Sequence, residues 1–120
     1  MDSVHLSLGH IQIAAPRGCE DAARKFYGRI LGLEEIPKPE ALRQRGGCWF
    51  RCGRHQVHIG VDPDFRPAKK AHPAFAVAGF EALRNRLLER GCEVIDDNLA
   101  GIKRFYANDP WGNRVEFIEG

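Results

Sequence analysis

The sequence contains no long apolar run and almost no net charge. No segment approaches the roughly 20 apolar residues of a membrane-spanning helix, and the opening residues Met1 to His5 have neither the basic start nor the apolar core of a secretory signal. The 18 Lys and Arg residues are nearly balanced by 16 Asp and Glu residues, with which they are interspersed. We therefore expect a cytoplasmic protein that binds neither a membrane nor nucleic acid.

The four cysteines are irregularly spaced and do not form a metal-binding motif. Cys48 and Cys52 fall on one face of a predicted strand, but an extended chain separates them by roughly 13 Å, too far for both to bind one metal ion. In a reducing compartment such thiols are mostly small buried apolar groups. We interpret the cysteines as structural; they are Cys19, Cys48, Cys52 and Cys92.

Two halves of the chain repeat each other. A length of 120 residues suits one domain, or two half-size modules that share a core. His10-Ile11-Gln12-Ile13 opens the first half as His72-Pro73-Ala74-Phe75 opens the second, and Val57-His58-Ile59 closes the first as Val115-Glu116-Phe117 closes the second. We expect a single domain over residues 1–120, made of module 1 (about 5–62) and module 2 (about 71–119).

Each half is predicted to contain a strand, a helix and three further strands. Alternating apolar residues indicate the strands, and apolar residues at helical spacing before Gly32 and Gly91 indicate one amphipathic helix in each half. The expected strands are at 10–14, from 36, and at 48–52, 55–61, 72–77, 93–95, 102–107 and 114–118, and the expected helices at 20–31 and 80–90. The predicted fold class is therefore α+β, with two βαβββ modules.

The strand periodicity places four polar side chains on equivalent faces. His58 and Glu116 each stand between two apolar residues of opposite parity, and His10 and His72 oppose their apolar neighbours in the same way. These side chains therefore lie on the face turned away from the helices, where a curled mixed sheet would form a cup around them. Imidazole and carboxylate are ligands of divalent metals, so His10, His58, His72 and Glu116 form a candidate metal site.

Several features, taken in their order along the chain, resemble the vicinal oxygen chelate superfamily. They are His10, the helix end Phe26-Tyr27-x-x-Ile30-Leu31-Gly32-Leu33, His72, and Asp109-Pro110-Trp111-Gly112-Asn113 leading into Val115-Glu116-Phe117. The resemblance spans nearly the whole chain. This superfamily includes glyoxalase I, fosfomycin-resistance transferases, extradiol dioxygenases, methylmalonyl-CoA epimerase and bleomycin-resistance proteins, and its paired modules form a sheet-walled cup that binds a divalent metal.

The resemblance implies a role for each candidate residue. His10, His72 and Glu116 match the two-His-one-carboxylate set of the transferases and dioxygenases, and His58 stands at a fourth position, where glyoxalase I has a Glu. Because paired carboxylates help to move the substrate proton in glyoxalase I, His58 argues against that reaction but not against metal binding. The metal could be Zn, Ni, Mn or Fe, and Glu116 could leave it to act as the catalytic base.

Two classes of function stay open. The first is a metal-dependent enzyme that chelates two adjacent oxygens of a small-molecule substrate in a glyoxalase-, thiol-transferase- or dioxygenase-like reaction. The second is a metal-free binding protein of the bleomycin-resistance type, with a bulky ligand in a cleft between subunits that Trp49, Phe50 and Trp111 could line. The ligand set favours the enzyme. The resemblance also implies a homodimer, because one βαβββ module makes only half a cup.

Overall fold

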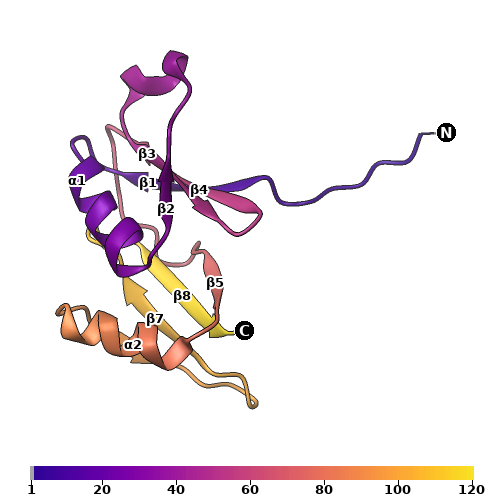
Figure 1. Cartoon of the computed structure of the whole chain (residues 1–120), viewed down its shortest axis with the longest axis vertical. Helices are drawn as coiled ribbons and strands as arrows, with labels where there is room; N and C mark the ends of the chain where they lie inside the picture. Colours follow the sequence, from indigo (N-terminus) through magenta and orange to yellow (C-terminus); the bar gives the residue numbers. More distant parts are fainter. Residues whose placement is uncertain (1) are drawn as a thin grey trace.

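The computed structural model describes residues 2–120, which form two four-stranded mixed sheets of identical topology (Figure 1). The strand order is β1-β4-β3-β2 in the first sheet and β5-β8-β7-β6 in the second. The first strand of each sheet pairs in parallel with the last, and the other pairs are antiparallel. The sheets do not close into a barrel. The predicted α+β class is confirmed, and so is the order of elements in each half.

The strands lie close to their predicted positions. They are β1 (His10–Ala15), β2 (Glu34–Ile36), β3 (Cys48–Cys52) and β4 (His55–Val61) in the first sheet, and β5 (Ala74–Val77), β6 (Val94–Asp96), β7 (Arg104–Asn108) and β8 (Arg114–Glu119) in the second.

Each half has one helical segment that packs on its sheet. In the first half α1 (Glu20–Ala23) continues directly into η1 (Arg24–Ile30), a π-helical stretch whose wider turn ends with the Leu31 N–H bonded to the Phe26 oxygen at 2.9 Å. In the second half α2 spans Phe80–Glu89. Figure 1 shows both segments on the same side of the molecule, and Nη1 of Arg86 on α2 reaches the backbone oxygen of Ile30 at 2.9 Å.

The apolar core lies between these helices and the sheets. The helical segments bury Phe26, Tyr27 and Ile30 from η1, with Phe80, Leu83 and Leu87 from α2. The last strand of each sheet contributes Val57 and Ile59, or Val115 and Phe117. Because side chains alternate along a strand, this packing leaves His58 and Glu116 on the faces of their sheets that point away from the helices, as the periodicity predicts.

Some element boundaries differ from the prediction, and proline accounts for two of the differences. Strand β2 ends at Ile36, where a strand was expected to begin, because Pro37 and Pro39 cannot donate to a strand ladder. Strand β5 begins at Ala74, so His72 lies outside the strand, in the segment before Pro73. Residues Glu40–Arg45, where no helix was predicted from the sequence, form a 3₁₀ helix, η2. Residues 99–102 form a tight turn ahead of β7, with backbone bonds in both directions between Leu99 and Ile102.

The turn between β7 and β8 is held by buried polar contacts. Oδ1 of Asp109 accepts the backbone N–H groups of Trp111 and Asn113 at 3.1 and 2.8 Å. Its Oδ2 accepts the Tyr27 hydroxyl at 2.8 Å and Nδ2 of Asn113 at 2.9 Å. The same Nδ2 donates to the backbone oxygen of Ala14 on β1 at 2.9 Å. The turn thus joins the second sheet to the helix and the first strand of the first half.

The N-terminal residues 2–9 form an arm that projects away from both sheets (Figure 1). Its apolar residues alternate with polar or small ones, and they are the most exposed large apolar side chains described: Val4 at 81%, Leu6 at 94% and Leu8 at 67%. An exposed apolar stripe of this kind is typical of a surface that another molecule covers. No helix within residues 2–120 is both long enough and apolar enough to cross a membrane.

Candidate metal centre

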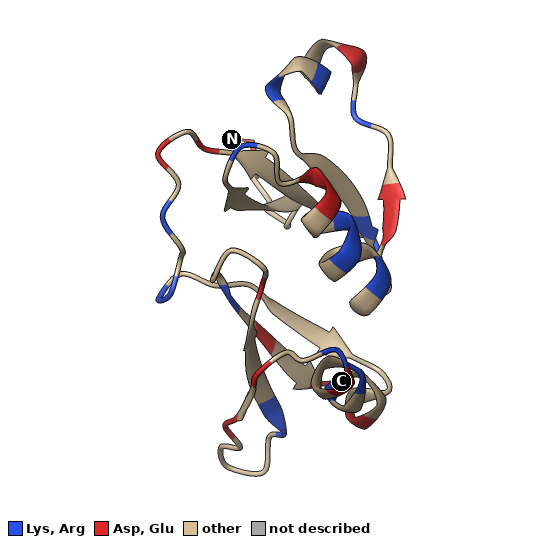
Figure 2. Ribbon diagram, turned by 90° about the vertical axis from the view of Figure 1, so that its left-hand side faces the viewer, with Lys and Arg blue, Asp and Glu red and all other residues tan. Residues whose placement is uncertain are grey.

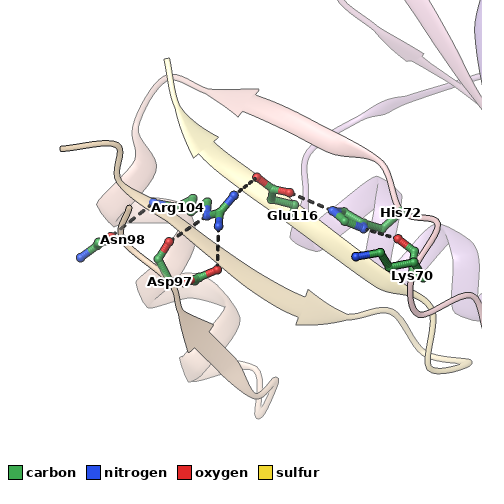
Figure 3. A network of polar contacts seen from close by, with 6 residues as sticks. All are labelled: Lys70, His72, Asp97, Asn98, Arg104 and Glu116. Carbon is green, nitrogen blue, oxygen red and sulfur yellow. Dashed lines mark hydrogen bonds and ion pairs between the residues drawn. The ribbon is translucent and has the colours of Figure 1, made fainter. Parts of the chain in front are cut away.

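At the second sheet a buried carboxylate is paired with a half-buried imidazole. Glu116 on β8 is only 6% exposed, and its Oε1 lies 2.8 Å from Nε2 of His72 (Figure 3). The other ring nitrogen of His72, Nδ1, lies 2.9 Å from the backbone oxygen of Lys70. The second carboxylate oxygen, Oε2, lies 3.6 Å from Nη1 of Arg104. The pair is therefore held from both sides.

These contacts fit a pair of metal ligands. A carbonyl oxygen only accepts hydrogen bonds, so Nδ1 of His72 carries the proton in its contact with Lys70, and neutral His72 then has its lone pair on Nε2. Carbonyl contacts commonly fix the tautomer and orientation of metal-bound histidines in this way. Nε2 lies 2.8 Å from Oε1 of Glu116, so a metal ion could be held by both atoms.

Arg104 is fixed in its position by a neighbouring loop. Its Nε donates to the backbone oxygen of Asp97, and its Nη2 donates to Oδ2 of the same residue, both at 2.8 Å (Figure 3). The remaining Nη1 faces Glu116. This arrangement leaves Oε1 as the carboxylate oxygen of Glu116 that is directed toward His72.

The first sheet carries a stack of three aromatic rings on adjacent strands. The Trp49 indole on β3 lies parallel to the His58 ring on β4, with centroids 3.7 Å apart and planes at 3°. His10 on β1 stacks against His58 with centroids 4.0 Å apart and planes at 21°. Nε2 of His58 also lies 2.8 Å from Oε1 of Gln56, which precedes it on the same face. Stacking and this hydrogen bond together fix the orientation of the His58 ring.

The environment of His58 favours its neutral form. Burial holds the pKa of His58 below its ordinary value, and the nearby charges of His10 and Lys38 act in the same direction. Histidine binds metal ions only when neutral, so a lowered pKa extends the pH range in which His58 is available as a ligand.

The structure places the four predicted ligands as two pairs in separate sheets. His10 contacts His58 in the first sheet, and His72 contacts Glu116 in the second. Within residues 2–120, no three His, Cys, Asp or Glu side chains are grouped closely enough to hold a metal ion. A protein site for a divalent transition metal usually supplies three or four ligands, so each pair is half of such a site.

Sequence reasoning did not identify two residues that position these pairs, Arg104 and Gln56. A signal for both exists in the strand alternation. Gln56 has the same parity as His58, and Arg104 has the opposite parity to the buried Phe105. Each therefore belongs to the polar face of its strand, where the candidate ligands also lie.

A family model described as the Glyoxalase/Bleomycin resistance protein/Dioxygenase superfamily matches residues 7–117. The chain therefore belongs to this superfamily, as the motifs in its sequence indicated. A search of curated proteins found none that matches.

Solved structures show the same fold. The chain is 52% identical to a protein assigned to the glyoxalase family from Bacillus anthracis, with a TM-score of 0.94 over 100% of this chain and 99% of that one. It is 20% identical to lactoylglutathione lyase from Agrobacterium tumefaciens, with a TM-score of 0.73 over 95% of this chain and 93% of that one. It is also 20% identical to a glyoxalase/dioxygenase from Nostoc punctiforme, with a TM-score of 0.77 over 98% of this chain and 97% of that one. The last two likenesses concern the fold alone.

Proposed function

We propose that His10, His58, His72 and Glu116 hold one divalent metal ion, and that the protein is a metal-dependent enzyme acting on a small molecule with two adjacent oxygens. The observation that carries the proposal is the half-buried contact between Nε2 of His72 and Oε1 of Glu116, with Nδ1 of His72 held by the Lys70 carbonyl. A histidine whose tautomer is fixed beside a buried carboxylate is what a metal of the Zn, Ni, Mn or Fe type binds.

We further propose that the complete site forms in a homodimer, with one pair of ligands from each chain. Two observations support this arrangement. The two pairs lie in different sheets, and neither pair alone supplies enough ligands. The exposed apolar side chains of the N-terminal arm also leave a surface that a second copy could cover. A twofold axis would then generate two equivalent sites, each built from the first sheet of one chain and the second sheet of its partner.

The residues of the site have distinct roles in this proposal. The metal would supply a Lewis acid that polarises the substrate oxygens. Glu116 provides negative charge and, in an isomerisation, accepts a proton at Oε1, since its Oε2 faces Arg104. His58 replaces the carboxylate that glyoxalase I uses at the same position, so this site has one base fewer and one negative charge fewer. This difference argues against the glyoxalase reaction and favours a transferase- or dioxygenase-like one.

Metal analysis tests the ligand assignment directly. The purified protein would be loaded separately with Zn²⁺, Ni²⁺, Mn²⁺ and Fe²⁺, and the bound metal measured by elemental analysis. We expect one ion per chain in the wild type and almost none in His72→Ala or Glu116→Ala. His55→Ala is a matched control, because His55 lies on β4 with the parity opposite to His58. Unchanged metal content in both ligand variants would refute the assignment. Tight binding of a bleomycin-like ligand by metal-free protein, without turnover, would instead favour a binding protein of the bleomycin-resistance type.

Mixing two inactive variants tests whether the site spans the dimer. His58→Ala removes a ligand of the first sheet and His72→Ala one of the second, so neither variant alone forms an intact site. If each site combines the two chains, a mixed dimer has one intact site, and random reassociation of equal amounts restores about a quarter of the wild-type metal. If each chain supplies all four ligands to its own site, mixing restores nothing.

A further inference from the structure

A concave pocket in the first half has a basic lining beside His58. Its volume is about 270 Å³, and it lies between the helix η2 and the face of the first sheet that carries His58. The polar residues that line it are Gln12, Lys38, Arg45, Trp49 and His58; the remaining lining residues are aliphatic or glycine. Two of these side chains carry positive charge and none carries negative charge.

The segment that forms the wall of this pocket is itself basic. Residues 37–47 contain Lys38, Arg43 and Arg45 but a single acidic residue, Glu40, and Glu40 does not line the pocket. Figure 2 shows this helical turn at the outer end of the first sheet, with an acidic segment where it begins, basic segments toward its other end and a further basic segment in the chain that leads into it. The carboxylate of Glu20 approaches the same segment, where its Oε2 accepts the Gly47 N–H at 2.6 Å, but Glu20 does not line the pocket. The pocket therefore has a positive wall.

The lysine on this wall is held in place. Nζ of Lys38 donates to the backbone oxygen of Gly46, another lining residue, and the side chain is half-buried. An ammonium group has three donors, so two remain for a ligand after this contact. Arg45 is exposed at the other end of η2, so its guanidinium is accessible to a ligand entering the pocket. Two cations facing a concave surface attract an anion more strongly than isolated surface charges do.

We propose that this pocket binds an anionic group of the substrate, a carboxylate or a phosphonate, through Lys38 and Arg45. This inference rests on the proposed function, because His58 is both a proposed metal ligand and part of the pocket lining. A substrate whose adjacent oxygens bind the metal then extends its charged end toward η2. The volume of about 270 Å³ is just below the usual range for ligand pockets, which suits a short acid rather than a bulky molecule.

Matched pairs of small acids test the proposal. On the Zn²⁺-loaded protein, malate, 2-hydroxyglutarate and 2-hydroxyadipate would each be compared with the 2-hydroxy acid that has a methyl group in place of the distal carboxylate. Both members of a pair present the same chelating end, and the series varies the reach of the second charge. We expect at least one diacid to bind roughly tenfold or more tightly than its partner, the effect of a hydrogen bond between charged groups.

The variants decide whether the pocket causes the difference. In Lys38→Ala/Arg45→Ala the preference for the diacid should disappear while the metal content stays at the wild-type level. Arg54→Ala is the control for loss of a positive charge, because Arg54 lies in the turn between β3 and β4, outside the pocket lining, and it should keep the preference. Equal affinities within every pair in the wild type, or an unchanged preference in the double variant, would overturn the proposal.

A measurement on metal-free protein separates this proposal from the metal assignment. Methylphosphonate would be titrated while the indole N–H signal of Trp49, a lining residue, is followed by NMR and identified with Trp49→Phe. A shift that saturates in the wild type and is lost in Lys38→Ala/Arg45→Ala supports the anion site even if no metal is found. A signal that does not move, in a protein that does bind metal, refutes the anion site and leaves the metal site standing.

Discussion

Removing the hydroxyl of Tyr27 should weaken the connection between the two halves by a measurable amount. Tyr27 is completely buried, and its hydroxyl donates to Oδ2 of Asp109 at 2.8 Å. A hydrogen bond to a charged group is worth about 1.5–3 kcal/mol. In Tyr27→Phe the Oδ2 atom keeps its contact with Nδ2 of Asn113, so it is not left without a partner. We therefore expect a loss of about 2 kcal/mol in the free energy of unfolding, in the lower part of that range.

Equilibrium unfolding in urea at a fixed protein concentration measures this loss. For a domain of this size, about 2 kcal/mol corresponds to a fall in Tm of roughly 6–12 °C. Tyr106→Phe is the control, because it removes the same atom from a half-buried tyrosine on β7. We expect the control to stay within about 0.5 kcal/mol of the wild type, as most peripheral substitutions do. If Tyr27→Phe is equally mild, the buried hydrogen bond does not contribute as reasoned.

Other predictions concern glycine, alkaline pH, cysteine and the proposed base. Gly47→Ala should lower the free energy of unfolding in urea far more than the control Gly53→Ala. A Cβ atom at Gly47 (φ +81°) would lie 2.0 Å from the Ile59 oxygen, whereas a Cβ atom at Gly53 (φ +58°) would meet nothing within 4 Å. Equal effects would contradict this contact. Burial raises the pKa of Tyr27, whereas free tyrosine ionises near pH 10. The contribution of the Tyr27 hydroxyl to the free energy of unfolding should therefore be full below about pH 10 and decline above it. Urea midpoints should show this decline in the wild type but not in Tyr27→Phe. Iodoacetamide at pH 8 should modify Cys92 and Cys52 before Cys48, since burial raises the pKa of Cys48 to about 12; mass spectrometry giving the reverse order would refute this. Glu116→Gln should lower turnover by roughly 10²–10⁴-fold, the usual cost of losing a general base; a smaller loss would remove that role.

The fold could be predicted from the sequence because its signals are local. The alternation in β4 and β8 correctly placed His58 and Glu116 opposite the core, and Gly32, with φ +80°, ends the first helical segment as predicted. The boundaries of β2 and β5 differ from the prediction because proline lacks the N–H group that a strand ladder needs. The alternation of apolar residues indicates where a strand lies but does not locate its first or last residue.

The arrangement of the candidate site could be predicted only in part. Strand parity shows which face a side chain occupies but not how far apart two sheets lie, so it did not show that the four candidate ligands form two pairs in separate sheets. The contacts of Asp109 were missed for a similar reason. The sequence Asp109-Pro110-Trp111-Gly112-Asn113 is typical of a turn, and Gly112 has the expected positive φ of +92°. Nothing local indicates that Tyr27 and Ala14, from the other half, meet it.

The polar contacts of this turn also make the two halves of the repeat unequal. The corresponding turn of the first half, between β3 and β4, is only Gly53 and Arg54, too short to carry a buried Asp and Asn of its own. The turn of the second half therefore contacts the first half, and the first half has no turn that makes the equivalent contacts with the second. A chimeric chain with two copies of the first half would keep both sheet topologies but would lack the groups that fasten one sheet to the other. Duplication can explain why the halves look alike, whereas the buried polar contacts between them depend on a divergence confined to a single turn.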